Sequence, residues 1–338
     1  MHPKFGLMDQ GWAPPEMSDA ESIAQTVGTI NLADELGFDS AWVGEHHHRR
    51  PEAAFWGRVS ASELVLAHAA ATTSSIALGT GVRVLSTTTA LRTAEEMSML
   101  SVLSGGRVDF GIGLGSGQPG MQSRDEKAAA FRVLVSDLLA FLRNDPATGL
   151  PELSPVSPVD ITTRLWAAAR DEPTIAHLAD LGINLVVGQA ETGPVQANYV
   201  EQYRKAGGKG RTRGVRLVHV APTHAEALAR TEAASDLYFS QMTKGGYHKE
   251  AIDKGLFPAE PESREAMLEQ INFIVGTPET VIKELNTYIA QTGVDQLDAM
   301  VRIPRLAIGD VHECMRLLKR EVIPNLAFGV APMWSKTA

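Results

Sequence analysis

Eight short apolar segments alternate with helix-length segments along this chain, and no other feature of the sequence constrains the fold as strongly. Each apolar segment has the length and residue types of a buried strand. Strands separated by helices form parallel sheets with right-handed crossovers, and eight such units favour a closed barrel over an open sheet. The segments expected as strands are 4–9, 40–43, 76–85, 108–113, 164–169, 183–187, 215–221 and 297–303.

The chain length is compatible with one barrel. Although 338 residues could form two domains, an α/β barrel uses about 250 residues or more as a single domain. The proline-rich stretch 144–158 is expected to be a connecting loop, because the alternation resumes beyond it. Two helices, 264–273 and 278–291, are expected to precede the last strand. We therefore expect one α/β domain over residues 1–338, a (β/α)8 TIM barrel with loop insertions at the carboxyl ends of its strands. One of these insertions, 243–261, is a candidate lid.

Charge and cysteine content exclude several classes of protein. The formal net charge is -9, from 31 Lys and Arg against 40 Asp and Glu, so no basic surplus is available to bind nucleic acid or an anionic membrane. Cys314 is the single cysteine, which excludes an intramolecular disulfide and indicates a reducing compartment. No apolar run approaches the about 18 residues of a membrane span, and the N-terminus lacks a signal-peptide pattern. We expect a cytoplasmic protein that acts on a small molecule.

The second expected strand ends at Gly44 and is followed directly by Glu45, His46, His47 and His48. Polar residues at the carboxyl ends of parallel strands commonly form sites. Because side chains alternate along a strand, His46 and His48 are expected on one side and His47 on the other. Adjacent histidines cannot easily all face one ion, so no metal site is expected. A solvated histidine cluster is the alternative to a catalytic one.

Glycines on the third and fourth strands indicate a second candidate feature. Gly79 and Gly81, and then Gly111, Gly113 and Gly115, fall on the side of their strands that faces the barrel interior. Missing side chains are compatible with space for a flat, ring-shaped ligand. They are equally compatible with tight packing of the barrel interior. The run 111–117 is a weak match to a dinucleotide fingerprint, because its spacing differs and no helix begins inside it.

Several stretches together resemble the bacterial luciferase-like flavin-dependent monooxygenase family. The resemblance covers nearly the whole chain and keeps the order of the elements. It implies a (β/α)8 barrel that uses reduced FMN, supplied by a separate flavin reductase, and molecular oxygen. It also implies oxygenation of a small organic substrate through a C4a-peroxyflavin, and a homodimer formed through the alanine-rich helix 60–74. The stretches are LADELGFDSAWVGEHH (32–47), IALGTGVRVL (76–85), AEEMSMLSVLSGGRVDFGIGLG (94–115) and FIVGTPETVIKEL (273–285).

The same resemblance assigns site residues. His46 matches the histidine that supports the oxygenated flavin, and a neighbouring Glu45 is expected to tune its proton affinity. Gly81 and Val82 match a non-prolyl cis peptide under the flavin ring. The other residues expected to bind the cofactor are Gly113, Gly115, Ser116, Arg170, Asp171, Thr174 and Gly188.

The phosphate of the flavin is expected at a helix N-terminus that carries Arg170, Asp171 and Thr174, where free amide groups and the helix dipole attract anions. Luciferase has an arginine after the fourth strand, where this chain has Leu114. We therefore expect Arg170 to carry the charge opposite the phosphate. These departures leave light emission and an aldehyde substrate open. The alternatives are a dehydrogenase or reductase that uses the deazaflavin coenzyme, a catalytically idle flavin-binding barrel, and a metal-dependent barrel hydrolase.

Overall fold

The computed structural model describes residues 4–48, 52–115, 123–244, 252–253, 260–329, 332 and 334. Parallel strands form a closed barrel, because the first strand pairs with the last and every strand pairs with its neighbours. The predicted (β/α)8 TIM barrel is confirmed. In barrel order the eight strands are β1 (Lys4–Asp9), β3 (Ser40–Val43), β5 (Ala77–Val84), β6 (Val108–Gly113), β7 (Leu165–Ala168), β8 (Asn184–Val187), β9 (Thr212–Val220) and β11 (Gln296–Met300).

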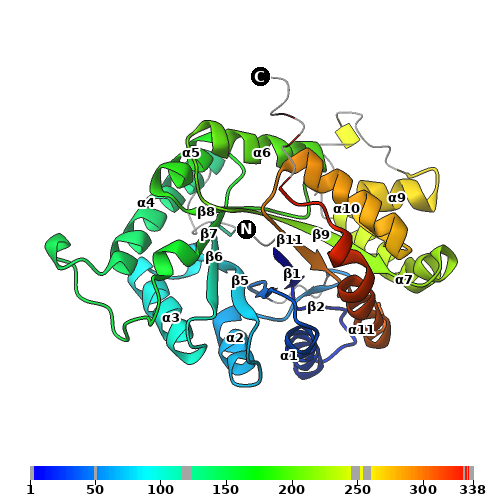
Figure 1. The fold of residues 1–338 in the computed structure, drawn as a ribbon, viewed down its shortest axis with the longest axis horizontal. Helices are drawn as coiled ribbons and strands as arrows, with labels where there is room; N and C mark the ends of the chain where they lie inside the picture. Colours follow the sequence, from blue (N-terminus) through cyan, green and yellow to red (C-terminus); the bar gives the residue numbers. More distant parts are fainter. Residues whose placement is uncertain are drawn as a thin grey trace.

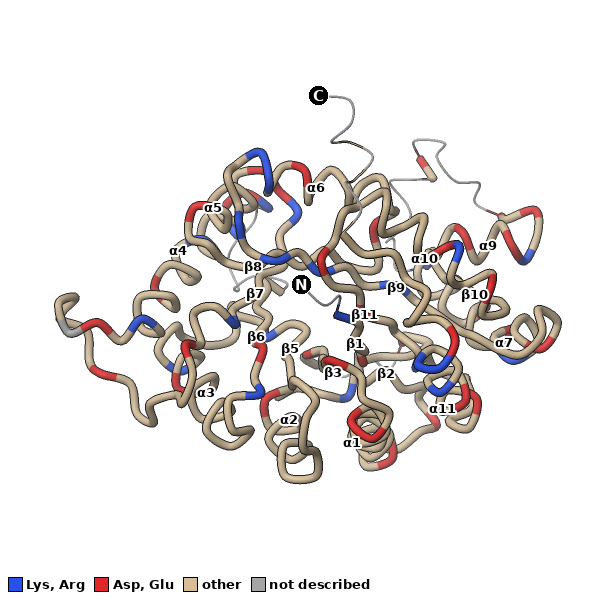
Figure 2. Tube along the Cα trace, viewed as in Figure 1, with Lys and Arg blue, Asp and Glu red and all other residues tan. Residues whose placement is uncertain are grey.

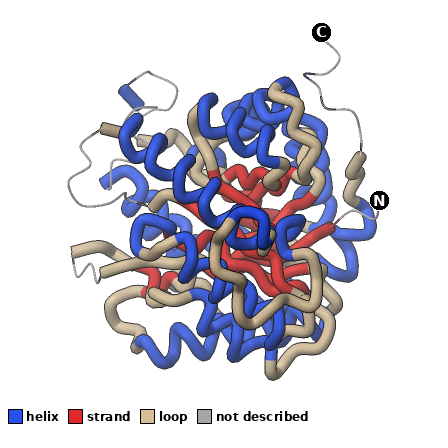
Figure 3. The backbone as a smooth tube through the Cα atoms, turned by 90° about the vertical axis from the view of Figure 1, so that its left-hand side faces the viewer, coloured by secondary structure: helices blue, strands red, loops and turns tan. Residues whose placement is uncertain are grey.

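Helices surround the strands on the outside (Figure 1), and the strands occupy the centre in the turned view (Figure 3). Local signals fix the helix ends. The first helix begins after Ser18, whose side chain accepts the N–H of Glu21, and ends at Gly37 in the left-handed conformation. The helices are α1 (Asp19–Leu36), α2 (Ser62–Ala70), α3 (Ala90–Leu103), α4 (Arg124–Arg143), α5 (Glu172–Leu181), α6 (Gly193–Lys205), α7 (His224–Lys244), α9 (Arg264–Gln270), α10 (Pro278–Thr292) and α11 (Ile308–Leu317).

One segment that the sequence predicted as the end of a helix is a strand in the structure. The helix expected over 264–273 ends at Gln270, and Phe273–Gly276 forms strand β10 instead. β10 pairs with the carboxyl half of β9, where Leu217 pairs with Phe273 on one edge and with Met300 of β11 on the other. Helical periodicity cannot separate a four-residue apolar strand from the end of a preceding helix, so the pattern alone was not decisive here.

The barrel interior is closed by large side chains rather than open as a pore. Trp42 of β3 and Trp166 of β7 meet edge to face with ring centroids 5.8 Å apart, and the guanidinium of Arg213 of β9 lies 3.5 Å from the Trp42 ring centroid. Arg213 donates to Asp298 of β11 at 2.7 Å. Burial raises the pKa of Asp298 to about 6, and the adjacent guanidinium limits that rise. Since β3, β7 and β9 are not neighbours in the sheet, these contacts cross the interior.

The outer surface carries both signs of charge. Lys and Arg, and Asp and Glu, occur on helices all round the barrel (Figure 2). None of the helices in the described part of the chain has the length and apolar character needed to cross a membrane.

β9 also carries a fully buried histidine. His219 is 0% exposed, and neither ring nitrogen has a hydrogen-bond partner among the described residues. Burial lowers the pKa of His219 to about 4, and the carboxylate of Asp310 opposes this only in part. His219 is therefore neutral in the folded protein near neutral pH.

We predict that His219 makes the folded protein less stable as the pH falls from 6.5 toward about 4, while protonation of Asp298, whose pKa is raised to about 6, acts in the opposite direction. In this window the unfolded chain binds a proton at His219 that the folded chain does not. The contribution of His219 to the free energy of unfolding therefore decreases. When the pH has fallen to about 4, the loss of free energy of unfolding that His219 causes reaches about 3 kcal/mol. His219→Leu should therefore retain more of its Tm than wild type as the pH falls across this window, whereas His68→Gln on the exposed face of α2 should follow wild type. The same pH dependence in wild type and His219→Leu would contradict the prediction.

Candidate functional site

The predicted site residues that the structure describes lie at or just beyond the carboxyl ends of barrel strands. His46 follows β3, the Gly81–Val82 peptide lies in β5, and Gly188 follows β8. Ser116 and most of the candidate lid lie outside the described residues. The described members of the set, in chain order, are Glu45, His46, Gly81, Val82, Gly113, Gly115, Arg170, Asp171, Thr174 and Gly188.

His46 is held by groups from two neighbouring segments. Its Nε2 lies 2.8 Å from Oε1 of Gln10, just beyond β1, and its backbone N–H donates to the carbonyl of Val59 at 2.8 Å. The imidazole packs on Gly57 of β4 (Trp56–Gly57), where a Cβ would overlap the ring. The glycine thus leaves the room that the half-buried imidazole occupies.

Glu45 faces the opposite side of the same strand tip. Its fully buried carboxylate accepts from Nη1 of Arg83 at 2.7 Å, and the same oxygen lies 2.8 Å from Nε2 of His47. The predicted separation of His46 from His47 is confirmed by these different partners. Strand alternation turns the carboxylate of Glu45 with His47 toward Arg83. That Glu45 tunes the proton affinity of His46 stays a prediction. Arg83 was missed, since nothing in its local sequence marks it.

The peptide bond between Gly81 and Val82 is cis, as the family resemblance implied. In the same region β5 shifts its register against β6, between Thr80 and Arg83. Gly81 and Val82 both lie within this shift, and both face the barrel interior. Arg83 therefore points outward, toward Glu45 and the helices.

Neighbouring side chains fill the space beside the interior glycines. At Gly81, a Cβ would lie 2.7 Å from Sδ of Met8. The same holds on β5 and β6, where a Cβ would overlap Trp42 at Gly79, Val82 at Gly113 and Val84 at Gly115. Of the two interpretations that the sequence left open, tight packing therefore accounts for these glycines.

The N-terminus of α5 brings together a helix cap and a cation. Asp171 is the N-cap, and its carboxylate accepts the N–H of Thr174 at 3.0 Å. Arg132 of α4 donates from Nη1 to the hydroxyl of Thr174 at 3.1 Å, and this nitrogen is 3.7 Å from Asp171. The sequence did not indicate Arg132, because it lies within a long helix and far along the chain from α5. It is the cation that contacts this helix N-terminus.

Arg170 has a different neighbour from the one expected. Its Nε forms an ion pair with Glu191 in the loop between β8 and α6. A Cβ on Gly188 would lie 3.3 Å from Glu191 and 3.7 Å from Nη2 of Arg170, so this glycine lies next to the pair. Arg170 and Gly188 are thus brought together, but a carboxylate already occupies one side of the guanidinium.

An aromatic cluster lies beside the His46 segment. Trp12 of β2 (Trp12–Ala13) lies 5.2 Å from Phe55 and 5.5 Å from Tyr238 of α7, between ring centroids. β2 pairs with β4, the strand whose Gly57 supports His46. The cluster therefore connects α7 to the loops around the end of β3.

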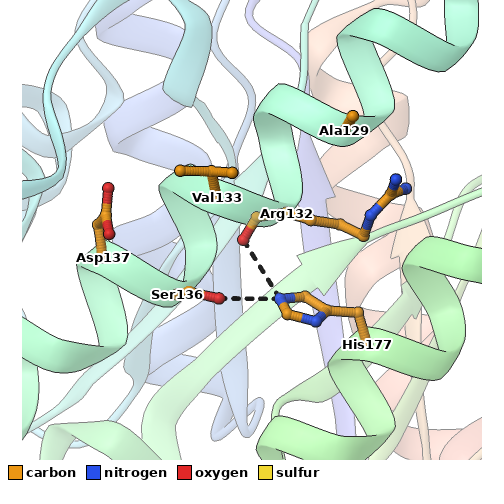
Figure 4. Close-up of a pocket in the computed structure, with 6 residues that line it drawn as sticks. All are labelled: Ala129, Arg132, Val133, Ser136, Asp137 and His177. Atoms are coloured by element: carbon orange, nitrogen blue, oxygen red, sulfur yellow. Dashed lines mark hydrogen bonds between the residues drawn. The ribbon is translucent and has the colours of Figure 1, made fainter.

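A groove of about 410 Å³ lies between the outer helices α4 and α5. In Figure 4 the side chain of Arg132 extends toward α5, and the ring of His177 is held by Ser136 at 2.9 Å and by the Arg132 carbonyl at 3.2 Å. Arg132 connects this groove with the cap of α5 through its bond to Thr174. The groove is a surface feature separate from the strand ends that carry His46. Its lining residues are Ala129, Arg132, Val133, Ser136, Asp137 and His177.

Within the described ranges, no three or more His, Cys, Asp and Glu side chains are grouped so that they could hold a metal ion. The histidines at the end of β3 are instead divided between partners on two faces.

Comparison with known proteins agrees with this architecture. N-acetyl-S-alkylcysteine monooxygenase of Bacillus subtilis (strain 168) is 26% identical over 303 residues, which cover 83% of this chain and 87% of that protein. The oxygenating constituent of 3,6-diketocamphane monooxygenase from Pseudomonas putida, solved in complex with FMN, has a TM-score of 0.77 at 17% identity, covering 96% of this chain and 99% of that chain.

A coenzyme F420-dependent tetrahydromethanopterin reductase from Methanopyrus kandleri has a TM-score of 0.70 at 19% identity, covering 97% of this chain and 100% of that chain. These two structural similarities show the fold alone. The family model of the luciferase-like monooxygenases matches residues 3–296. The chain therefore belongs to the luciferase-like monooxygenase family.

Proposed function

We propose that this protein is a flavin-dependent monooxygenase that uses reduced FMN and molecular oxygen to oxygenate a small organic substrate. The observation that carries the proposal is the half-buried imidazole of His46, held by Gln10 at the carboxyl end of a barrel strand. Enzymes with this fold place their reacting groups at that end. The similarity to a curated monooxygenase over most of the chain supports the same reaction class.

The residues present fit a flavin phosphate at the N-terminus of α5. A phosphate needs a cation and hydrogen-bond donors, and the Arg132 guanidinium and the Thr174 hydroxyl supply both. The Arg132 side chain is 28% exposed, so it can contact a ligand while it holds Thr174. Asp171 uses its carboxylate to cap the helix, which orients this turn rather than binding an anion.

His46 can move a proton at a defined atom. With Oε1 of Gln10 as the acceptor, Nε2 of His46 carries the hydrogen of this bond. The imidazole is thus oriented to hold or accept a proton near neutral pH. Reduced flavin, when bound, supplies the electrons that activate oxygen. The protein supplies orientation, exclusion of water and proton control.

We further propose that a separate flavin reductase supplies the reduced flavin. The related structure is itself described as the oxygenating constituent of its monooxygenase, which supports a two-component arrangement. A deazaflavin-dependent dehydrogenase or reductase is the second candidate, because enzymes of that kind share the fold. An anaerobic titration with reduced FMN and with the deazaflavin separates the two. Tight binding of the deazaflavin with no binding of FMN would overturn the first proposal, and flavin binding without oxygen turnover would indicate an idle barrel.

A homodimer through α2 and α3 is also proposed. Leu64 on α2 is 69% exposed and Leu103 on α3 is 55% exposed, although both are large and apolar. The alanine surface expected to form the interface is only partly available, because Ala69 and Ala70 are buried against the barrel. The leucines therefore replace the alanines as the expected contacts.

Arg132→Ala should weaken binding of reduced FMN much more than binding of riboflavin, which has no phosphate. Loss of a charge-assisted hydrogen bond costs roughly 1.5–3 kcal/mol, which is at least about tenfold in Kd. Arg170→Ala is the matched control, and its smaller expected effect follows from its ion pair with Glu191. Anaerobic titrations of wild type and the two variants with each ligand, followed by flavin absorbance, give the six affinities. Equal losses for the two ligands in Arg132→Ala would place the phosphate elsewhere.

His46→Ala should keep the wild-type Tm within a few degrees, bind reduced FMN and divert oxygen to hydrogen peroxide instead of product. The reason is the loss of the imidazole that controls the proton at the reacting centre. His47→Ala is the control from the opposite face of the strand. Measured peroxide and product yields decide the outcome, and uncoupling by His47→Ala alone would assign the role to the other histidine.

Light scattering at micromolar concentration should give the mass of a dimer for wild type and a monomer for Leu64→Asp, because a buried unpaired carboxylate opposes association. Val133→Asp on α4, where Val133 is 61% exposed, is the control and should remain dimeric. A monomeric wild-type protein would exclude this interface.

A further inference from the structure

A buried ion pair joins the two segments that carry the proposed site. Glu45 immediately precedes His46, and Arg83 immediately follows Val82. Nη1 of Arg83 donates to Oε1 of Glu45 at 2.7 Å, and the exposed fractions of the two side chains are 9% and 0%. Both side chains lie on the outer face of their strands, opposite to His46 and Val82.

Backbone pairing does not hold these two segments together. The ladder between β3 and β5 ends at the pair Val43 and Thr80. His46 lies three residues beyond this ladder, as counted along the sequence. Past the ladder, the carboxylate of Glu45 accepts from Nη1 of Arg83 and from the N–H of Val84 at 3.4 Å. The side chain of Glu45 therefore connects the two segments beyond the point where the backbone hydrogen bonds of the sheet end.

Arg83 is itself anchored to the outer helices. Its Nε donates to Glu96 of α3 at 3.1 Å and lies 3.9 Å from Glu63 of α2. The guanidinium thus joins the end of β3 to β5 and to both helices. Its planar fork of donors allows several such contacts at once.

The carboxylate of Glu45 cannot lose this partner without rearranging. Its second oxygen is buried and has no hydrogen-bond partner among the described residues. Without Arg83 the carboxylate would keep the contacts of Oε1 with Nε2 of His47 and with the N–H of Val84, but a buried charge that loses its guanidinium partner is strongly unfavourable, so the side chain would move toward water. Since His46 is the next residue in the chain, that movement would displace the imidazole from Gln10.

We propose that Glu45 and Arg83 form a clamp that positions His46 relative to the Val82 segment. The inference rests on the proposed function insofar as His46 serves the oxygenation reaction. Glu45 and Arg83 are positioning residues, because they act on the reaction through the placement of His46 rather than by contact with substrate. In the intact enzyme the clamp keeps the proton-controlling atom at a fixed place above the barrel.

The test compares Arg83→Met, near the carboxyl end of β5, with a control variant at the amino end of the same strand. Arg107 precedes β6 and donates to the carbonyl of Ile76, just before β5, and to Thr73, both at 3.0 Å. Arg107→Met therefore removes a comparable multidentate arginine far along the strands from His46. Nitrogen-15 spectra of the histidine rings in the cofactor-free protein report the tautomer and environment of His46, and Tm reports the fold.

We expect Arg83→Met and Glu45→Gln each to shift the ring-nitrogen signals of His46. Arg107→Met should lower Tm and leave those signals in place. The double variant Glu45→Gln/Arg83→Met should displace His46 no further than either single change, because both remove the same clamp. If Arg83→Met does not fold, the isosteric Glu45→Gln decides the matter. Unchanged His46 signals in the folded variants, or an equal shift in Arg107→Met, would overturn the proposal.

Turnover kinetics provide a second, independent test of the clamp. Misplacing a reacting group by about 1 Å can cost on the order of 100-fold in rate, so Arg83→Met should lose coupled product through kcat while the KM for reduced FMN changes little. Arg83→Lys should restore part of the coupling, because it keeps the charge beside Glu45. If wild type does not bind reduced FMN, the proposed function fails, whereas the His46 spectra still decide whether the clamp exists.

Discussion

Side chains alternate between the inner and outer faces of the barrel strands, and this alternation determines which residues meet at the carboxyl ends of those strands. Apart from the cis peptide of β5, where Gly81 and Val82 both face the interior, a strand that reaches this end presents one residue to the interior and the next to the surrounding helices. Gln10 reaches His46, whereas the preceding Asp9 accepts two bonds from Arg302 at 2.8 Å each. His46 and Glu45 repeat this division. The groups proposed to carry chemistry and the groups that fix the strands are thus adjacent in sequence.

The barrel could be predicted from the sequence because its signal is repeated eight times along the chain, so that an error at one element does not change the architecture. β10 could not be predicted, since a strand of four residues depends on the pairing edge that β9 provides. The direction of Glu45 follows from alternation once the tip of β3 is fixed. The partners of the site, Arg83 and Arg132, could not be found in this way, because each contacts a residue 38 or more positions away in the chain.

The glycines show how composition can suggest more space than the fold contains. Alternation correctly placed Gly79 and Gly113 toward the interior, yet the volume next to them is taken by Trp42 and Val82 from adjoining strands. Interior side chains pack to nearly crystalline density. The space beside a glycine in a barrel strand is therefore filled by the side chains of adjoining strands. Space for a ligand depends on the loops beyond the strands.

The aromatic cluster around Trp12 has a consequence for how such a protein can diversify. Trp12, Phe55 and Tyr238 belong to connections outside the barrel ladders, and the N–H of Ala54 donates to Gln241, 187 residues away, at 3.1 Å. Mutations there leave the strand pairs of the barrel and the ion pair of Glu45 in place. The aromatic cluster and the barrel strands can therefore evolve at different rates.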